Sequence, residues 1–289
     1  MRAGRRFGVR SSFVRADFEG YLESVLGPLR VEQDRSWDHG EADVLRVVDA
    51  DGVTWYAKHH RRKEHHAREL AAYQDWVPSL GERAPRLRAF DEELQVLVLS
   101  AVPGEAYSNL PPELHQQAGA LLRRFHDVEF LSPWTDFAAE KRAELERWAA
   151  RADGLLEPRE VDFVRSEVRG FERLPAPPRV PCHLDYSPRN WLIADSTVYI
   201  IDFERARPEI WINDVGRLYF GDWQGNPALR EAFWDGYGRM PAADDLALLI
   251  GGYALTAMST IIWAHEHNDQ AFEGWGRELL AGLMRRTYG

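Results

Sequence analysis

One polar segment followed by a hairpin-like pattern constrains the fold of this chain more than any other feature. Residues 183–190 read HLDYSPRN and fit the pattern H-x-D-x-x-x-x-N. The apolar stretches Trp191–Ile193 and Val198–Ile201 follow, separated by a turn-forming segment, and Asp202 comes directly after them. Short apolar runs on either side of a polar turn predict a β-hairpin. The polar side chains therefore lie at the two ends of one predicted hairpin.

This arrangement predicts a site for phosphoryl transfer. Asn190 and Asp202 each lie six positions from Ser196, and residues equidistant from a hairpin turn face one another at roughly 5 Å. Phosphoryl transfer requires a carboxylate that positions the attacking hydroxyl and accepts its proton, and oxygen ligands that hold Mg²⁺. Asp185, Asn190 and Asp202 supply these groups. Each residue type alone is common in turns. The eight-residue pattern H-x-D-x-x-x-x-N, however, arises by chance only about once in a hundred chains of this length.

The first third of the chain is predicted to be rich in strands. Val44–Val48 and Thr54–Lys58 flank an Asp-Gly turn sequence, which is typical of a hairpin. Apolar residues in 65–77 recur at helical spacing until Pro78, which predicts an amphipathic helix. Leu94–Ser100 predicts a buried strand.

Residues of these elements are candidates to bind a nucleotide. Lys58, at the end of its strand, is placed to neutralise the α- and β-phosphates of ATP. Glu69 on the following helix could hold the ammonium group, although Glu64 on the same segment could compete for this role. The backbone at Ser100 and Val102 is the candidate for contacts with adenine.

The break at Val102-Pro103-Gly104-Glu105 marks the expected boundary between two lobes. Residues 1–102 are predicted to form a nucleotide-binding lobe, and residues 103–289 a helical lobe with the catalytic loop and the acceptor site. A loop over the phosphates is expected at Ser36–Glu41, around its single glycine, Gly40. Helices are predicted at Leu114–Asp127, Phe137–Ala152 and Pro158–Leu174, with several more towards the C-terminus.

Composition limits the possible partners. The chain has 36 basic and 46 acidic residues and a formal net charge of −10, which argues against a nucleic-acid groove and leaves a surface able to attract cations. Cys182 is the only cysteine, so an intramolecular disulfide is excluded and a cytoplasmic location is expected. Glycine, serine and threonine interrupt the apolar segment Leu246–Ala264, which predicts a buried core helix rather than a membrane span. The oligomeric state stays open.

At these residues the chain resembles the aminoglycoside phosphotransferase and choline kinase family, small-molecule relatives of the protein kinases. The resemblance spans nearly the whole chain. It implies an α+β, bilobal protein-kinase-like fold with a small β-rich N-terminal lobe, a larger and mainly helical C-terminal lobe, and an ATP cleft between them. It also implies Asp185 as the catalytic base, Asn190 and Asp202 as magnesium ligands, and phosphate-binding roles for Lys58 and Glu69.

Several departures favour this family over protein kinases proper. The phosphate loop is reduced, Leu184 replaces an arginine in the catalytic loop, and Glu204 replaces the glycine after Asp-Phe. No Ala-Pro-Glu segment is present. Residues 211–218 resemble the segment in which these kinases carry an acidic residue that braces the catalytic loop. We assign this role to Asp214, for which a helix N-cap is the alternative.

The resemblance also suggests what is phosphorylated. A hydroxyl of a cationic antibiotic is the leading hypothesis, such as an aminoglycoside or a basic peptide or nucleoside antibiotic. The alternatives are a metabolic kinase for a sugar, amine or amino alcohol, and a non-catalytic nucleotide-binding module. Candidate carboxylates for a cationic acceptor are Glu204, Asp222, Asp235, Asp244, Asp245, Glu266 and Glu273. Candidate stacking residues, which are otherwise expected in the core, are Trp211, Trp223, Trp234, Trp263 and Trp275.

Overall fold

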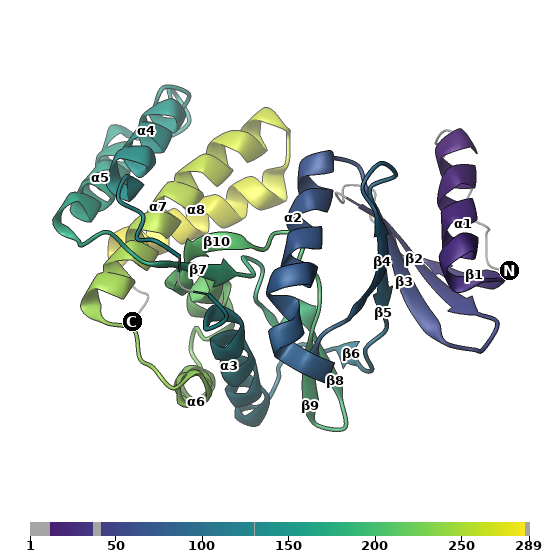
Figure 1. Ribbon diagram of the computed structural model, residues 1–289. Helices are drawn as coiled ribbons and strands as arrows, with labels where there is room; N and C mark the ends of the chain where they lie inside the picture. The colour runs from purple at the N-terminus through teal and green to yellow at the C-terminus, as the bar shows by residue number, and fades with distance from the viewer. Residues whose placement is uncertain (1–11, 37–41, 130, 287–289) are drawn as a thin grey trace, which may run out of the picture. The chain divides into compact units, whose positions relative to one another are not determined.

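The computed structural model describes residues 12–36, 42–129 and 131–286, and the chain divides into two units (Figure 1). One unit comprises residues 1–104 and 199–205, and the other comprises residues 105–198 and 206–289. The first unit contains an antiparallel sheet and the second is mainly helical, so the predicted α+β class is confirmed. Most of the expected phosphate loop, including Gly40, lies outside the described residues.

A five-stranded sheet forms the centre of the first unit, in the order β1-β2-β3-β5-β4. Its strands are β1 (Leu29–Asp34), β2 (Ala42–Asp49), β3 (Thr54–His60), β4 (Leu87–Asp91) and β5 (Val96–Ser100). The predicted first hairpin is confirmed as β2 and β3, with Val44 opposite Lys58. The carboxylate of Asp49 accepts the amide protons of Asp51 and Val53 at 3.0 and 2.9 Å, which stabilises the turn. Strand β3 pairs with β2 on one side and with β5 on the other, so it is the central strand of the sheet.

Two helices cover opposite faces of this sheet (Figure 1). They are α1 (Ser12–Leu26) and α2 (Lys63–Asp75), and a short 3₁₀ segment, η1 (Val77–Arg83), follows α2. Helix α1 buries Phe18 and Leu22 in a core cluster that contains Ala57 of β3. Because side chains alternate along a strand, the neighbouring Lys58 points to the other face, towards α2. Helix α2 was predicted, but α1 was missed.

Helices make up most of the second unit. In the described part of the chain they are α3 (Pro112–His126), α4 (Phe137–Ala149), α5 (Pro158–Gly170), α6 (Pro227–Tyr237), α7 (Ala243–Glu266) and α8 (Gln270–Arg285). The three predicted helices are confirmed as α3, α4 and α5, with ends within a few residues of those expected. Proline occupies the first position of α3, α5 and α6, where its fixed φ suits a helix start and no amide donor is lost.

Helix α7 confirms the predicted core helix. Leu249, Ala254, Met258 and Ile262 have no exposed surface. The helix is also long and apolar enough to cross a membrane, but 56% of its most apolar stretch is buried inside the protein. Its apolar character is thus used largely for packing.

Two small sheets contain the strands on either side of residues 183–190. One pairs β7 (Arg179–Cys182) with β10 (Arg207–Ile210), and the other has the order β6 (Glu105–Ala106), β8 (Trp191–Ala194), β9 (Thr197–Ile200). The predicted second hairpin is β8 and β9. Its two-residue loop, Asp195 and Ser196, has φ values of 47° and 58°, which suits a tight hairpin turn. The boundary between the units falls within β9.

Two glycines allow α3 and α6 to approach closely. A Cβ atom at Gly236 would lie 1.8 Å from the carbonyl oxygen of Gln116, and one at Gly119 would lie 2.1 Å from that of Phe233. The two helix backbones therefore touch directly at these points. This contact fixes Tyr237 of α6, whose hydroxyl lies 2.9 Å from Nδ1 of His126.

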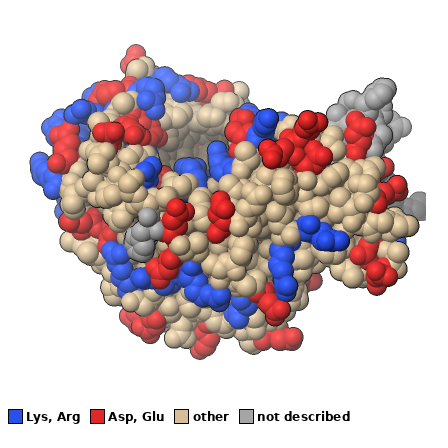
Figure 2. Space-filling model, viewed as in Figure 1, with Lys and Arg blue, Asp and Glu red and all other residues tan. Residues whose placement is uncertain are grey.

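Acidic and basic side chains are interspersed over the face shown in Figure 2. The net negative charge of the chain is therefore not gathered there into one acidic area. On this face, recognition of a charged ligand must depend on a local site rather than on the summed electrostatic potential of the surface.

We expect Gly236→Ala to lower the stability of the protein by about 1–3 kcal/mol, because the new methyl group overlaps the backbone of α3. Gly274 of α8 provides the matched control, since nothing lies within 4 Å of a Cβ placed there. Gly274→Ala should be neutral or stabilising by up to about 1 kcal/mol through its higher helix propensity. Thermal unfolding of both variants measures the difference, and equal effects would contradict the close contact.

Candidate active site

A buried ion-pair cluster surrounds Lys58 in the first unit. Its ammonium nitrogen lies 2.8 and 3.0 Å from the two carboxylate oxygens of Glu69 and 2.9 Å from Oδ1 of Asp202. Lys58 is 7% exposed and Glu69 is fully buried. The predicted pairing of Lys58 with Glu69 is confirmed, whereas the competitor Glu64 is exposed. The structure thus brings three of the predicted site residues together.

The charges of this cluster keep the lysine protonated. Burial alone lowers the pKa of Lys58, but the carboxylates of Asp202 and Glu69 outweigh it and hold this pKa well above its ordinary value. Burial raises the pKa of Glu69, while Lys58 and a hydrogen bond from His60 lower it, and the net direction is downward. Lys58 therefore stays positively charged and Glu69 stays negatively charged near neutral pH.

His60 was missed by the sequence analysis. Its Nε2 lies 2.7 Å from Glu69 Oε2, and its side chain is fully buried. A signal was available, because His60 lies two positions after Lys58 on the same strand and so points to the same face of the sheet. His60 fixes the orientation of the glutamate that holds the lysine.

The Asp-Phe-Glu segment belongs to the first unit. Asp202 has a φ of 69°, in a region that few residues other than glycine adopt, and such strain is concentrated at functional sites. Phe203 is fully buried and packs edge-on against Tyr73 of α2, with ring centroids 5.5 Å apart. Burial, and then the charge of Asp202, raises the pKa of Glu204. The segment is thus anchored on α2 beside Lys58.

The candidate adenine contacts lie at the end of β5. The amide of Ser100 donates to the carbonyl oxygen of Arg86 at 2.9 Å, and that of Ala101 donates to Thr54 at 3.4 Å. These two amides are used within the first unit. The backbone of Val102 is therefore the stronger candidate of the two predicted positions.

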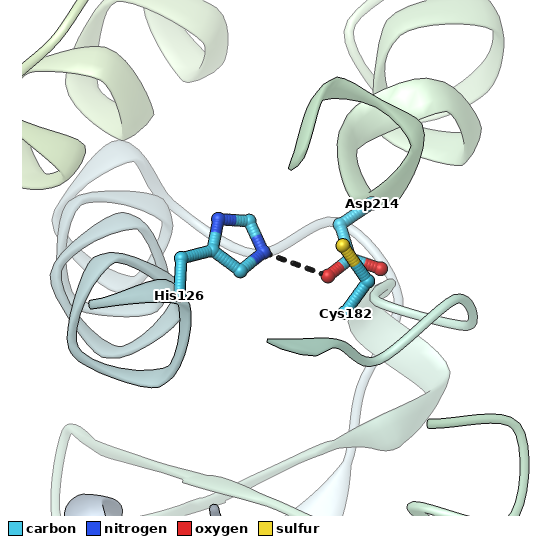
Figure 3. A group of neighbouring side chains, drawn as sticks. All are labelled: His126, Cys182 and Asp214. Carbon is cyan, nitrogen blue, oxygen red and sulfur yellow. Dashed lines mark hydrogen bonds and ion pairs between the residues drawn. The ribbon is translucent and has the colours of Figure 1, made fainter. Parts of the chain in front are cut away.

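In the second unit, Asp214 braces the loop that carries Asp185, as predicted. Its carboxylate accepts the amide protons of His183, at 2.8 Å, and Leu184, at 2.5 Å. Leu184 has a φ of 61°, which is costly for a branched side chain and requires such external support. His126 of α3 lies 2.9 Å from the same carboxylate (Figure 3). Asp214 is 2% exposed, so the brace is held away from water.

His126, Cys182 and Asp214 lie close enough to suggest a metal site (Figure 3). Their bonding argues against one. Backbone amides and His126 already occupy the carboxylate of Asp214. Burial, and then the charges of Asp214 and Glu209, raises the pKa of Cys182 well above its ordinary value, so its sulfur stays a thiol. This cluster is structural.

Asp185 is buried on the braced loop, with only 4% of its surface exposed. The side-chain amide of Asn190 donates to its backbone oxygen at 2.9 Å and to its Oδ2 at 3.1 Å, and Arg189 also donates to Oδ2. Arg217 Nε lies 3.0 Å from the other oxygen, Oδ1, in an orientation that makes no hydrogen bond. Among the described residues, Oδ1 has no hydrogen-bond partner.

A cavity of about 470 Å³ adjoins this loop within the second unit. Arg189 and Arg217 line it, and aromatic side chains form much of its wall. A Cβ at Gly216 would lie 2.1 Å from the ring of Tyr253, so glycine lets this ring lie against the backbone beside Arg217. The further lining residues are Ala106, Tyr107, Ser108, Ser187, Pro188, Phe220, Gly221, Asp222 and Trp275.

Few of the candidate acceptor residues lie at this cavity. Asp222 lines it, and burial raises its pKa. The other candidate carboxylates of the second unit are exposed or paired: Asp235 and Asp244 are exposed, Asp245 binds Trp211 and Arg239, Glu266 pairs with Arg151, and Glu273 pairs with Arg277. Of the tryptophans, Trp211, Trp223 and Trp234 are buried in the core, and only Trp275 lines the cavity.

The predicted site residues thus form two groups. Lys58, Glu69 and Asp202 meet in the first unit, and Asp185 and Asn190 meet in the second. Their roles in binding nucleotide and metal, and the meeting of Asn190 with Asp202 at one ion, stay predictions.

Comparison with known proteins places these groups in context. A family model described as the phosphotransferase enzyme family matches residues 37–249, about three quarters of the chain. No curated protein sequence matches. A macrolide 2′-phosphotransferase from Brachybacterium faecium is similar in structure, with 15% identity over 92% of this chain and 98% of that one and a TM-score of 0.64.

Two aminoglycoside phosphotransferase structures are also similar. One, a complex with GDP and kanamycin, has 15% identity over 93% of this chain and 99% of that one, with a TM-score of 0.69. The other, a thermostable mutant in a ternary complex with ADP and hygromycin B, has 14% identity over 94% and 99%, with a TM-score of 0.68. At such identities the likeness shows a shared kinase-like fold.

We expect Glu69→Gln to destabilise the protein by roughly 3 kcal/mol, because it removes one partner from a buried ion pair. Glu64→Gln, on the exposed face of the same helix, should change stability by less than about 0.5 kcal/mol. Because the pKa of Glu69 is lowered from 4.5, its contribution is complete above that pH and declines below it. Denaturant unfolding should therefore show the gap between wild type and Glu69→Gln narrowing below pH 4.5. A gap independent of pH would contradict the assignment.

Proposed function

This chain belongs to the phosphotransferase enzyme family, and we propose that it transfers the terminal phosphoryl group of ATP to a hydroxyl group of a small molecule, with Mg²⁺ as the metal cofactor. One observation carries the proposal: Asp185 Oδ1 is buried, next to an arginine that lines the cavity, and among the described residues it lacks a hydrogen-bond partner. A buried acceptor atom without a donor is unfavourable unless a ligand supplies one. The hydroxyl of the acceptor is that donor.

The environment of Asp185 suits a catalytic base. Its Oδ2 is held by Asn190 and Arg189, so the carboxylate cannot rotate freely. Oδ1 then accepts the hydrogen bond of the acceptor hydroxyl and takes its proton as the oxygen attacks phosphorus. The ion pair with Arg217 keeps the carboxylate in place before the substrate arrives. Positioning, together with electrostatic stabilisation of the transferred group, accounts for most of the catalysis of phosphoryl transfer.

The residues present suit a magnesium nucleotide. Both amide protons of the Asn190 side chain point to Asp185, which leaves its oxygen for a metal. Asp202 adds a carboxylate, so the donor set consists of oxygen atoms, as Mg²⁺ prefers. When bound, Mg²⁺ neutralises charge on the transferred phosphate. The ammonium of Lys58, fixed by Glu69, is proposed to bind the other phosphates.

The acceptor is proposed to be an antibiotic or a metabolite. Kanamycin and hygromycin B, bound in two of the similar structures, support phosphorylation of an antibiotic, which would inactivate it and confer resistance. They also support the cationic acceptor expected from the sequence. The two arginines at the cavity argue against a polycation, which they would repel. Within the metabolic alternative they favour a sugar over an amine or an amino alcohol, because the latter two are cations.

Asp185→Asn should lower transfer by at least about a hundredfold, because general-base catalysis contributes that much or more, while ATP binding stays intact. Asp202→Ala should in addition weaken magnesium-dependent nucleotide binding. Asp235→Ala, at an exposed site on α6, is the control and should behave as wild type. The measurement is phosphate incorporation, read by mass, across aminoglycosides, macrolides, peptide and nucleoside antibiotics, sugars and amino alcohols.

The outcomes separate the candidate functions. A phosphorylated antibiotic supports a resistance kinase, and a phosphorylated metabolite supports the metabolic alternative. Full activity in Asp185→Asn would contradict the assignment of the base. Binding of ATP without transfer to any compound would favour a non-catalytic nucleotide-binding module.

A further inference from the structure

Two arginines converge on the catalytic carboxylate from the side of the acceptor cavity. Arg189 is the residue before Asn190, and Arg217 follows the segment that carries Asp214. Each contacts a different oxygen of Asp185, and both line the cavity. Their side chains remain 53% and 42% exposed. The carboxylate therefore fixes two guanidinium groups at the cavity without covering them.

Both guanidinium groups have N–H donors that Asp185 does not use. An arginine side chain carries five N–H donors in a rigid planar fork and never loses its charge near neutral pH. Asp185 accepts one hydrogen bond from Arg189 and makes only an ion pair with Arg217. Forks of this kind match the oxygen atoms of carboxylates and phosphates in pairs.

The described residues that line the cavity carry one more positive than negative charge, and Asp185, which pairs with both arginines, is buried and is not among them. Among the described lining residues Asp222 is the one carboxylate, and Arg189 and Arg217 supply the two guanidinium groups. A polycation entering the cavity would meet these two positive charges beside the base. At a partly buried site this repulsion is stronger than in bulk water.

The remaining wall is aromatic. Tyr107, Phe220, Tyr253 and Trp275 line the cavity, and Trp275 is 40% exposed. Its ring stacks on Phe272 with the centroids 5.7 Å apart and the planes at 9°. Phe272 in turn meets Trp263, and both are about 41% exposed. An exposed aromatic row thus extends from the cavity over α7 and α8, suited to a planar or apolar group.

Building on the proposed function, we propose that the acceptor is an anionic hydroxyl compound, in which a carboxylate or phosphate group binds Arg189 and Arg217 and a planar or apolar body packs against the aromatic wall. The anion holds the molecule so that its hydroxyl reaches Asp185. The two arginines then select the acceptor in addition to positioning the base.

A matched set of benzyl alcohols tests this proposal. All members share a hydroxyl and a planar ring: 4-(hydroxymethyl)benzoate, 4-(hydroxymethyl)phenyl phosphate, the neutral 4-(hydroxymethyl)benzamide and the cationic 4-(aminomethyl)benzyl alcohol. Saturation-transfer NMR gives the Kd of each for the full-length protein. At least one anion should bind about tenfold or more tightly than the amide and the amine, since hydrogen bonds to charged groups are worth this much. The tighter anion identifies carboxylate or phosphate as the recognised group.

Substitutions of Arg217 test whether the anion binds at the cavity. Arg217→Gln should weaken binding of the preferred anion about tenfold and leave the amide unchanged, whereas Arg217→Lys should retain part of the preference. Arg142→Gln is the control, because Arg142 is an exposed arginine on α4 that pairs with Glu172 and does not line the cavity. Equal or tighter binding of the amide or the amine, or no binding of either anion, would overturn the proposal.

Titration with ATP and Mg²⁺ separates this inference from the proposed function. ATP binding without a preference for anions contradicts the inference alone. A preference for anions without ATP binding contradicts the proposed kinase function and leaves the anion site in place.

Discussion

The first unit depends on one constraint: a lysine charge buried in a protein must be paired with carboxylates. Lys58 lies on the central strand of the sheet, and Glu69, from the covering helix, and Asp202, from the Asp-Phe-Glu segment, neutralise it. His60 fixes the glutamate from the same strand. Strand, helix and returning segment are thus tied together by charge as well as by apolar packing. The same pairing leaves an ammonium group with a fixed position, which is what binding of a phosphate requires.

In the second unit a buried carboxylate, that of Asp214, stabilises a loop. Asp214 satisfies the amides of His183 and Leu184, so the loop can hold the unusual backbone conformation that presents Asp185. His126 extends the support to α3, and Tyr237 extends it to α6. The direct backbone contact of these two helices is therefore part of the support of the loop that carries Asp185. The arginines that flank Asp185 complete the arrangement at the cavity.

The sequence predicted the features that depend on local patterns. Both hairpins and α2 follow from alternation, turn residues and helical spacing, whereas the pairing of Lys58 with Glu69 was expected from the resemblance to the kinases. The structure confirms all of them. Of the features that depend on distant contacts, the resemblance supplied the role of Asp214, and others were missed. Arg217 joins Asp185 across 32 positions of sequence, and no periodicity announces such a contact. The acceptor carboxylates illustrate the same limit, because Glu266 pairs with Arg151, 115 positions away, and a one-dimensional pattern does not reveal such a partner.

Isothermal titration of ATP in the presence of Mg²⁺, with wild type and with Lys58→Met, tests most directly whether this arrangement serves phosphoryl transfer. Methionine keeps the length of the side chain and removes its charge, and thermal unfolding of the variant checks that it folds. The account predicts that ATP binds to wild type and that Lys58→Met weakens binding at least about tenfold, as expected for loss of charged hydrogen bonds. Absence of ATP binding by wild type, or equal binding by the two proteins, would contradict it.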